Sequence, residues 1–422
     1  MPDRTRVPPP SPAPAGTGDA DDFALARGDA LADELALAAT ATPLAPIVRD
    51  EIAEAGGRIT FARFMALALG HPEHGYYARE DLAWGRDGDY ETSPEVHPIF
   101  GFMWARQVLE CWERLGRPAP FALVEPGAGS GAFASAMLTW LRERAPACFA
   151  AARPVLLDGQ ARRLADQQRA LARRGLTAEH ALFDDWTARA EDLTGIVISN
   201  EFFDALPAHL IERRGDDLHE WYVEVDGDAF RFALGEPSTP ALAQRLAALG
   251  VTLGDGARAE IALAASGAMA RLAARFARGY ILTIDYGYDA PTLYAPWRRM
   301  GTLMAFRDHS PQPDPLASPG LLDLTYHVDF TSLASAADGW ARAPTVSQAE
   351  ALTALGIGEA LRAALARAAG DFARFAADRR AVETLTDMGG LGRMRVLALA
   401  KGAPLEGLRC LAPLGAPGAG GS

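Results

Sequence analysis

A cluster of glycines that follows an acidic residue is the feature of this sequence with the clearest chemical potential. The stretch FALVEPGAGSGAFASAM, residues 121–137, contains Glu125, Gly127, Gly129 and Gly131. Glycine has no Cβ, so a ligand can approach the backbone closely at these positions. The apolar run before the glycines predicts a buried strand, and the apolar spacing after them predicts a helix whose free N–H groups would point at the loop.

Two classes of ligand bind to loops of this kind. Dinucleotides are bound by a G-x-G-x-x-G/A pattern, which Gly127, Gly129 and Ala132 satisfy. Glu125, however, stands at the exit of the predicted strand, where its carboxylate would repel a pyrophosphate. S-adenosylmethionine carries a sulfonium and an ammonium and no phosphate, so it fits this acid better. A glycine-rich turn that binds no ligand is the third interpretation.

Acidic and aromatic side chains also follow the next two predicted strands. Asp158 ends a short apolar run. Its distance along the chain from the glycine loop is close to that at which an acid binds the ribose hydroxyls of a nucleoside. Asp184, Asp185 and Trp186 follow the third run. A carboxylate there could accept a hydrogen bond from an adenine amino group, and the tryptophan could stack on the ring. Packing in the core would explain the tryptophan equally well.

The segment NEFFDALP, residues 200–207, follows a fourth predicted strand at residues 195–199. Ligands of parallel sheets bind beyond the carboxyl ends of the strands. Asn200, Glu201 and Asp204 are therefore candidate site residues. The alternative is that the two acids only favour the dipole at the start of a helix.

The order of the predicted elements indicates an α/β fold, a Rossmann-like sheet with helices on both faces. An N-terminal helical extension precedes the sheet, and a β-hairpin insertion follows the fourth strand at residues 209–234. Residues 259–277 are predicted to be helical. The expected division is a disordered leader at 1–43, a helical or lid region at 44–118, the sheet domain at 119–401 with insertions at about 206–235 and 286–330, and a flexible tail at 402–422.

The composition limits the class of partner. The chain has 422 residues, 49% of them hydrophobic, and a net charge of −13, which argues against a nucleic-acid surface and favours cationic partners. Its 3 cysteines are scattered, so we expect neither a disulfide framework nor a thiolate metal site, and a reducing cytoplasm fits. No metal site is predicted, because His71 and His74 lack a third ligand nearby. No apolar run is long enough to predict a membrane span, and the sequence does not indicate an oligomeric state.

Several segments, in this order along the chain, resemble the MidA-like family, which includes a mitochondrial protein arginine methyltransferase that assists assembly of respiratory complex I. They are GRDGDYETSPEV, FALVEPGAGSGAF, ISNEFFDALPAHL, YILTIDYGY, DLTYHVDF and DMGGLGRMRVLAL. The glycine loop also resembles motif I of the class I methyltransferases. The similarity spans roughly residues 46–401, and the segments NEFFDALP and GD-x-x-TSPEV are more specific than the glycine loop.

This resemblance implies a class I methyltransferase fold, S-adenosylmethionine as cofactor, and a protein arginine as the methyl acceptor. By position, the three glycines lie in the cofactor loop, Asp158 stands at the ribose-binding acid, and residues 200–207 form the signature after the fourth strand. The chain departs from the family around the glycines, where the pattern is close to E-x-G-P-G-x-G-x-L-M. It also has Asp158 where the family more often has Glu, which shortens the reach to the ribose by one methylene.

Methyl transfer to arginine suggests roles for the acids. A guanidinium is a poor nucleophile, and carboxylates that hold it by paired hydrogen bonds would orient one nitrogen and then accept its proton. Glu201 and Asp204 are the expected catalytic acids. The loop before residue 98 supplies further substrate or lid candidates, namely Asp89, Thr92, Ser93 and Glu95. A catalytically silent assembly factor that binds the cofactor, and an NAD-type oxidoreductase, are the alternative functions.

Overall fold

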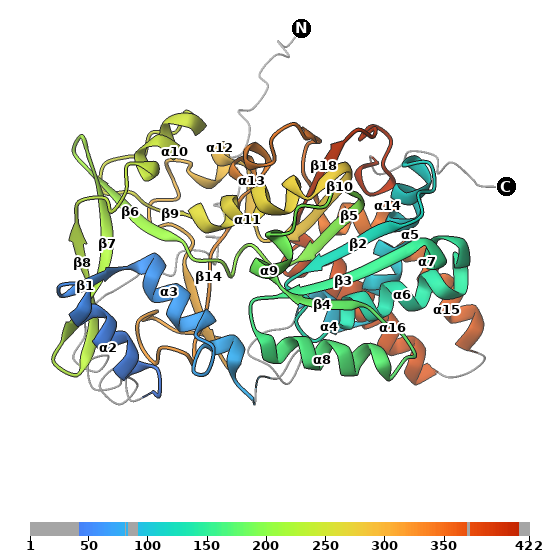
Figure 1. Ribbon diagram of the computed structural model, residues 1–422, viewed down its shortest axis with the longest axis horizontal. Coiled ribbons are helices and arrows are strands. Elements are labelled where there is room, and N and C mark those ends of the chain that lie inside the picture. Colours follow the sequence, from blue (N-terminus) through green and yellow to red (C-terminus); the bar gives the residue numbers. More distant parts are fainter. Residues whose placement is uncertain (1–41, 81, 83–91, 369–371, 413–422) are drawn as a thin grey trace, which may run out of the picture.

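A computed structural model describes residues 42–80, 82, 92–368 and 372–412 of the chain (Figure 1). The larger of its sheets has the strand order β16-β18-β10-β5-β2-β3-β4, with β17 also paired to β18. The strands that form its centre are β2 (Phe121–Pro126), β3 (Ala152–Asp158), β4 (Glu179–Leu182), β5 (Leu193–Asn200), β10 (Phe276–Asp285) and β18 (Arg395–Lys401). Five of these are parallel, and β18 runs antiparallel to β10. The predicted α/β fold is confirmed.

The strand order reverses direction between β2 and β5. From β2 the chain proceeds outward through β3 and β4, and it then returns to β5 on the other side of β2 and continues to β10. At such a reversal the loops at the carboxyl ends of the two central strands separate, which leaves a crevice for a ligand. The glycine loop follows β2, and residues 200–207 follow β5, so both reach this crevice.

Helices cover both faces of this sheet because its strands carry apolar side chains on both sides. Leu123 packs with α5 (Ile99–Arg114), α6 (Ala132–Arg144) and α14 (Gln348–Ala354) on one face. Its neighbour Val124 packs with α11 (Leu263–Ala274) and α13 (Phe330–Ala336) on the other. Successive side chains of a strand point to opposite faces, so an uninterrupted apolar run produces a buried strand of this kind.

The second sheet is antiparallel and contains the predicted hairpin insertion. Its order is β1-β7-β6-β9, with β8 paired to β7. The strands are β1 (Arg58–Thr60), β6 (His209–Arg214), β7 (Asp217–Asp226), β8 (Ala229–Gly235) and β9 (Arg258–Ile261). The helix expected from residue 259 is wrong at its start, because residues 258–261 pair with β6 and the helix begins only at Leu263.

The N-terminal helices pack against the second sheet (Figure 1). They are α2 (Ala45–Glu54) and α3 (Phe61–Gly70). Thr60 caps α3, since its side chain accepts a hydrogen bond from the Arg63 N–H at 3.1 Å. Phe61 and Phe64 of α3 contact Phe232 and Phe230 of β8, with ring centroids 5.7 and 6.1 Å apart.

The remaining elements surround these sheets. They are η1 (Tyr76–Ala78), α4 (Ser93–Val96), α7 (Pro146–Ala151), α8 (Ala161–Ala172), α9 (Phe183–Thr187), α10 (Ala241–Leu249), β11 (Gly287–Tyr288), α12 (Ala290–Leu293), β12 (Met304–Arg307), β13 (Ser310–Pro311), β14 (Asp323–Thr325), β15 (Val328–Asp329), β16 (Ala341–Arg342), β17 (Val346–Ser347), α15 (Ile357–Ala368), α16 (Phe372–Thr386), η3 (Leu391–Arg393) and η4 (Arg409–Leu411). No helix in the described ranges is long and apolar enough to cross a bilayer.

The ends of the chain differ from the expected division. Residues 402–412 are not a free tail, because Leu408 and Cys410 are buried in the core. The Cys410 N–H donates to the Gln107 side chain at 2.8 Å, which anchors this segment to α5. Thr42 is also buried and donates its hydroxyl to the Pro319 carbonyl at 2.7 Å. The rest of the expected leader, residues 1–41, and residues 413–422 lie outside the described residues.

Candidate cofactor and acceptor site

A cavity of about 400 Å³ lies at the carboxyl ends of β2 and β5, where the strand order reverses. The glycine loop forms one wall, and α3 contributes Met65 and Leu69 to another. Its lining residues include Tyr77, Thr92, Glu95, Glu125, Gly127, Gly129, Asp158, Gln160, Phe183, Asp184, Asn200, Glu201, Phe202 and Arg271. Most of the sequence-predicted site residues therefore meet in one place.

The glycine loop has a backbone that only glycine adopts without strain. The φ angles of Gly127, Gly129 and Gly131 are +68°, +50° and +80°. A Cβ on Gly127 would lie 2.7 Å from Cδ2 of Phe202, so the loop also packs directly against the segment after β5. The glycines are thus required both for the turn and for the close approach of two loops at the cavity.

Three buried acceptor oxygens belong to residues that line this cavity. Glu125 Oε2, Asn200 Oδ1 and Glu201 Oε2 have no hydrogen-bond partner among the residues that the structure describes. Burial raises the pKa of Glu125 well above its usual value, and the nearby charge of Asp158 adds to the effect. Buried acceptors without donors are costly, and a cationic ligand would satisfy them. S-adenosylmethionine, with an ammonium and a sulfonium, fits this set of donors and acceptors.

Asp158 is the last residue of β3 and lines the same cavity. Its Oδ1 accepts from the Gln160 N–H at 3.0 Å and its Oδ2 from the Gln167 side chain at 3.1 Å. Burial raises the pKa of Asp158 to about 6, opposed by its backbone hydrogen bonds and the charge of Arg163. The carboxylate is therefore held in one orientation at the edge of the cavity, as a ribose-binding acid would be.

We expect Asp158→Ala to weaken S-adenosylmethionine binding by about 1.5–3 kcal/mol, the usual range for hydrogen bonds to a charged group. Calorimetric titration of the purified variant measures this change. The same variant's thermal stability separates the two roles of the residue. A lower melting temperature with unchanged affinity would show that Asp158 only supports the loop at residues 159–160.

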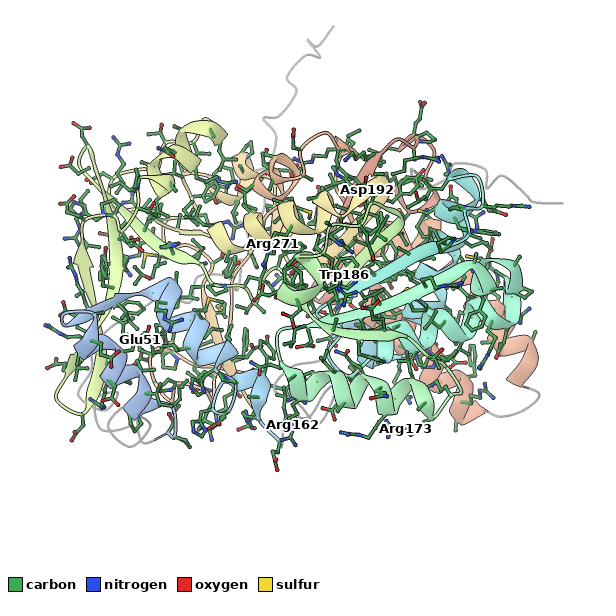
Figure 2. All side chains as sticks on the ribbon, viewed as in Figure 1. Glu51, Arg162, Arg173, Trp186, Asp192 and Arg271 are labelled. Atoms are coloured by element: carbon green, nitrogen blue, oxygen red, sulfur yellow. The ribbon has the colours of Figure 1, made fainter. Side chains whose placement is uncertain are left out.

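Of the three residues expected to contact the adenine, only one lines the cavity. Asp184 lines it and forms an ion pair with Arg271 at 2.7 Å, whereas Asp185 is exposed and does not line it. Trp186 is 2% exposed and packs in the core beneath Arg275, whose guanidinium lies 4.5 Å from the ring centroid. Trp186 is thus a core residue, and the interpretation that it stacks on the cofactor is wrong. Figure 2 shows Trp186 and Arg271 near the centre of the molecule.

Phe183 is an aromatic residue of the cavity wall that was not among the predicted site residues. It lines the cavity, and the Arg271 guanidinium lies 4.8 Å from its ring centroid. The strand β4 ends at Leu182, so Phe183 is the first residue beyond the sheet edge and Trp186 lies one helical turn further into the core. The residue at which β4 ends, and not the size of the side chain, therefore determines which aromatic residue lines the cavity.

The lid candidates before α5 also contribute to the site. Thr92 and Glu95 line the cavity, and Glu95 receives a hydrogen bond from the Ser130 hydroxyl of the glycine loop. Ser93 is buried, and its N–H lies 3.4 Å from Glu201 Oε1. The fourth candidate, Asp89, lies outside the described residues.

No metal site accompanies these residues within the part of the chain that the structure describes, since no group of three or more His, Cys, Asp or Glu could hold an ion. His71 stabilises a turn instead. Its Nδ1 accepts from the N–H groups of Glu73 and His74 at 3.3 and 3.1 Å.

Glu201 has the only strained backbone among the candidate acids in the described ranges, with a φ of +48°. Its N–H donates to the Ile284 carbonyl at 2.9 Å, and its Oε1 accepts from the Asn200 amide at 2.6 Å. The following loop is held on both sides, because Asp285 accepts from the Phe203 N–H at 3.0 Å and Tyr326 donates to the Phe203 carbonyl at 2.8 Å. Strain retained by such surrounding bonds is typical of functional positions.

Burial, followed by the charge of Asp204, raises the pKa of Glu201 to about 8. Between its usual value of 4.5 and 8, the folded protein holds a proton that the unfolded chain releases, so this group lowers stability as the pH rises. The loss amounts to about 1.4 kcal/mol or less per pH unit. We expect the free energy of unfolding to fall less steeply between pH 5 and 8 in Glu201→Gln than in the wild type. Equal slopes in urea titrations would contradict this assignment.

Asp204, three residues further on, does not line this cavity. It is 4% exposed, accepts a hydrogen bond from the Thr325 hydroxyl at 2.9 Å, and lines a second cavity of about 200 Å³. Burial raises the pKa of Asp204 to about 6. The two predicted catalytic acids therefore serve different cavities, Glu201 the first and Asp204 the second.

Comparison with known proteins agrees with this geometry. Residues 103–345 match a family model described as an S-adenosyl-L-methionine-dependent methyltransferase. The human mitochondrial protein arginine methyltransferase NDUFAF7 is 30% identical over 325 residues, 70% of each chain. Its Drosophila melanogaster homologue is 33% identical over 298 residues, 65% of each chain, so this match spans slightly less than two thirds of that relative.

A solved structure is similar over more of the chain. It is that of a superfamily member from Burkholderia thailandensis bound to S-adenosyl-homocysteine. It is 31% identical, covers 87% of this chain and 94% of its own, and superposes with a TM-score of 0.77. These similarities give no support to an NAD-type oxidoreductase. The reversal at β2 and β5, the cation-compatible cavity and the matched family model together show that the chain belongs to the MidA-like family of S-adenosylmethionine-dependent methyltransferases.

Proposed function

We propose that the protein transfers the methyl group of S-adenosylmethionine to an arginine side chain of a protein partner. The observation that carries the proposal is the pair of acids after β5, with half-buried Glu201 at the cofactor cavity and buried Asp204 at the second one. The names of the curated relatives support arginine as the acceptor. The net charge of −13 favours a cationic acceptor segment.

The two acids suit the chemistry of an arginine nucleophile. When bound, S-adenosylmethionine would supply an electrophilic methyl group; the bond from the attacking nitrogen to the methyl carbon would form as the carbon–sulfur bond breaks, with S-adenosyl-homocysteine as the leaving group. The protein must hold that nitrogen in line, and most of the rate enhancement then comes from positioning. A carboxylate bound to the guanidinium concentrates positive charge on the bonded nitrogens and orients the reacting one. Burial raises the pKa of Asp204, so its ionised form is a stronger base than an exposed aspartate and can accept the proton that the methylated nitrogen loses.

The acceptor is identified with lysate from a strain that lacks this gene. Purified protein and S-adenosylmethionine labelled in the methyl group are added, and labelled proteins are hydrolysed to amino acids. We expect the label in methylated arginine. Label in another amino acid would overturn the choice of acceptor, and an absence of label with intact cofactor binding would favour a catalytically silent binder.

We further propose that the methylated protein is a component or assembly partner of a respiratory complex, on the resemblance to the MidA-like family. Native gel electrophoresis of membranes from the deletion strain tests this role. Loss of an assembled complex, restored by the wild-type gene, is the expected result. If the respiratory complexes are unchanged in the deletion strain, the proposed role in their assembly is wrong. That result does not affect the proposed methyl transfer.

We propose the cytoplasm as the compartment, although the curated relatives are mitochondrial by name. Cys111, Cys148 and Cys410 are all buried and unpaired, which suits a reducing environment. Cell fractionation with antibody detection tests this proposal.

A further inference from the structure

Two segments that are far apart in the sequence meet along one side of the cofactor cavity (Figure 1). One consists of residues 65–79, which we call the wall segment; it contains the second half of α3, the turn after it and η1. Its cavity-lining residues include Met65, Leu69, Gly70 and Tyr77. The other segment is the start of α8, whose residues Gln160 and Arg163 line the same cavity.

Arg163 holds the wall segment through its guanidinium. Its side chain is only 5% exposed. The Nε group donates to the Tyr77 carbonyl at 2.9 Å, and Nη2 donates to the Arg79 carbonyl at 2.8 Å. Nη1 donates at 3.1 Å to Asp166, which lies one turn further along α8 and fixes the plane of the group. A planar guanidinium can bind two carbonyl oxygens at once, so this one residue ties both ends of η1 to α8.

Gln160 makes a second contact, at the end of α3. Its buried side chain donates from Nε2 to the Gly70 carbonyl at 2.7 Å. Gly70 is the last residue of α3, where carbonyl groups have no partner within the helix. The backbone N–H of Gln160 donates to Asp158 at 3.0 Å. The residue that holds the end of α3 therefore also orients the predicted ribose-binding acid.

A third contact between the same two segments lies on the surface. Arg162 and Glu80 form an ion pair at 2.6 Å, but their side chains are 44% and 83% exposed (Figure 2). Exposed ion pairs contribute little to stability, whereas buried donors that lose their acceptors are costly. The side chains of Gln160 and Arg163 are therefore the contacts that keep this side of the cavity closed.

We propose that Gln160 and Arg163 form a latch that holds the wall segment over the bound cofactor, so that the cofactor leaves only when the latch opens. Both are positioning residues, since they act on the cofactor through the wall segment. A protein whose binding-competent state is fully populated binds its ligand with full affinity, and the latch maintains that state. The inference needs only the cofactor, so it holds for any methyl acceptor.

The first test measures the release of S-adenosyl-homocysteine from the immobilised protein by surface plasmon resonance. We expect Arg163→Gln to raise the dissociation rate constant about tenfold or more, because bonds from a charged donor to two carbonyls are lost. Arg163→Lys keeps the charge without the planar pair of donors, so its rate should lie between the two. A partly unfolded variant would bind less ligand at saturation but release it at the wild-type rate.

Arg275→Gln is the matched control. Arg275 is also buried and donates to a backbone carbonyl, that of Arg189, but it lines neither of the two cavities. This variant should lose stability in urea titrations and keep the wild-type dissociation rate. Arg162→Ala should change that rate less than about twofold, because its ion pair is exposed.

Hydrogen exchange of the cofactor-free protein separates a latch from a direct contact with the cofactor. We expect Arg163→Gln and Gln160→Met to speed exchange in the wall segment, and Arg275→Gln to leave it unchanged. Gln160→Met keeps the backbone N–H that donates to Asp158, so it removes only the bond to α3. Its dissociation rate constant should rise about threefold or more.

Two results overturn the proposal. One is a wild-type dissociation rate constant in Arg163→Gln, and the other is unchanged exchange of the wall segment in that variant. If Arg163→Gln does not fold, the same two measurements on Gln160→Met decide the question.

Discussion

We expect Asp204→Asn to lower the rate of the proposed arginine methylation about 100-fold or more, the effect of losing a general base. The affinity for S-adenosylmethionine should remain nearly unchanged, because Asp204 lines the second cavity and not the cofactor cavity. Asparagine keeps the size of the side chain and can still accept from the Thr325 hydroxyl. The variant therefore removes the charge and the proton acceptor while preserving the local packing.

The measurement pairs single-turnover methylation of the labelled acceptor with calorimetric binding of the cofactor. A fall in both quantities would mean that the loop after β5 has moved, and the structural role would then explain the loss. If wild-type protein labels nothing in the lysate and Asp204→Asn fully complements the deletion, the catalytic interpretation fails. Cofactor binding would then be the remaining function.

We expect Gly129→Val to abolish measurable binding of S-adenosylmethionine, a loss of at least about 100-fold in affinity. The branched side chain occupies space beside the backbone that lines the cofactor cavity. Because the φ of Gly129 is +50°, valine also strains the backbone at this position. The predicted loss of binding therefore has to be separated from a loss of stability.

Gly215→Val is the matched control for this strain. Gly215 has a φ of +59° in the turn between β6 and β7, and a Cβ there meets no atom within 4 Å. Both variants should lose similar stability in urea titrations, and only Gly129→Val should lose the cofactor. Retention of wild-type affinity by a folded Gly129→Val protein would show that the loop serves the fold alone.

Local sequence patterns predicted the parts of the site that depend on one segment. The glycine loop, Asp158 at the end of β3 and the acids after β5 all lie next to a strand whose apolar run ends visibly in the sequence. The cap at Thr60 was predictable for the same reason, since its donor at Arg63 is only three residues away. These features need no knowledge of how distant segments meet.

Features that join distant segments were not predictable. Tyr77 and Asp323, which connect the two cavities, are 246 residues apart in the chain. The contribution of α3 to the cofactor cavity depends on the packing of this helix against β8. The sequence of β9 predicts a helix, because its four residues form a strand only by pairing with β6. The composition of residues 402–412 predicts a flexible tail, whereas contacts with α5, β10 and α14 give this segment its order.

The contact between α3 and β8 has a consequence for the synthesis of the protein. Phe61 and Phe64 are completely buried, and the rings that they contact, Phe232 and Phe230, are made about 170 residues later. At about 5–20 residues per second, the ribosome needs roughly 10–30 s to cover that distance. During this interval the nascent helix exposes its aromatic face, which makes it a binding site for chaperones. The cofactor cavity is complete still later, because Ala268 and Arg271 of α11 also line it.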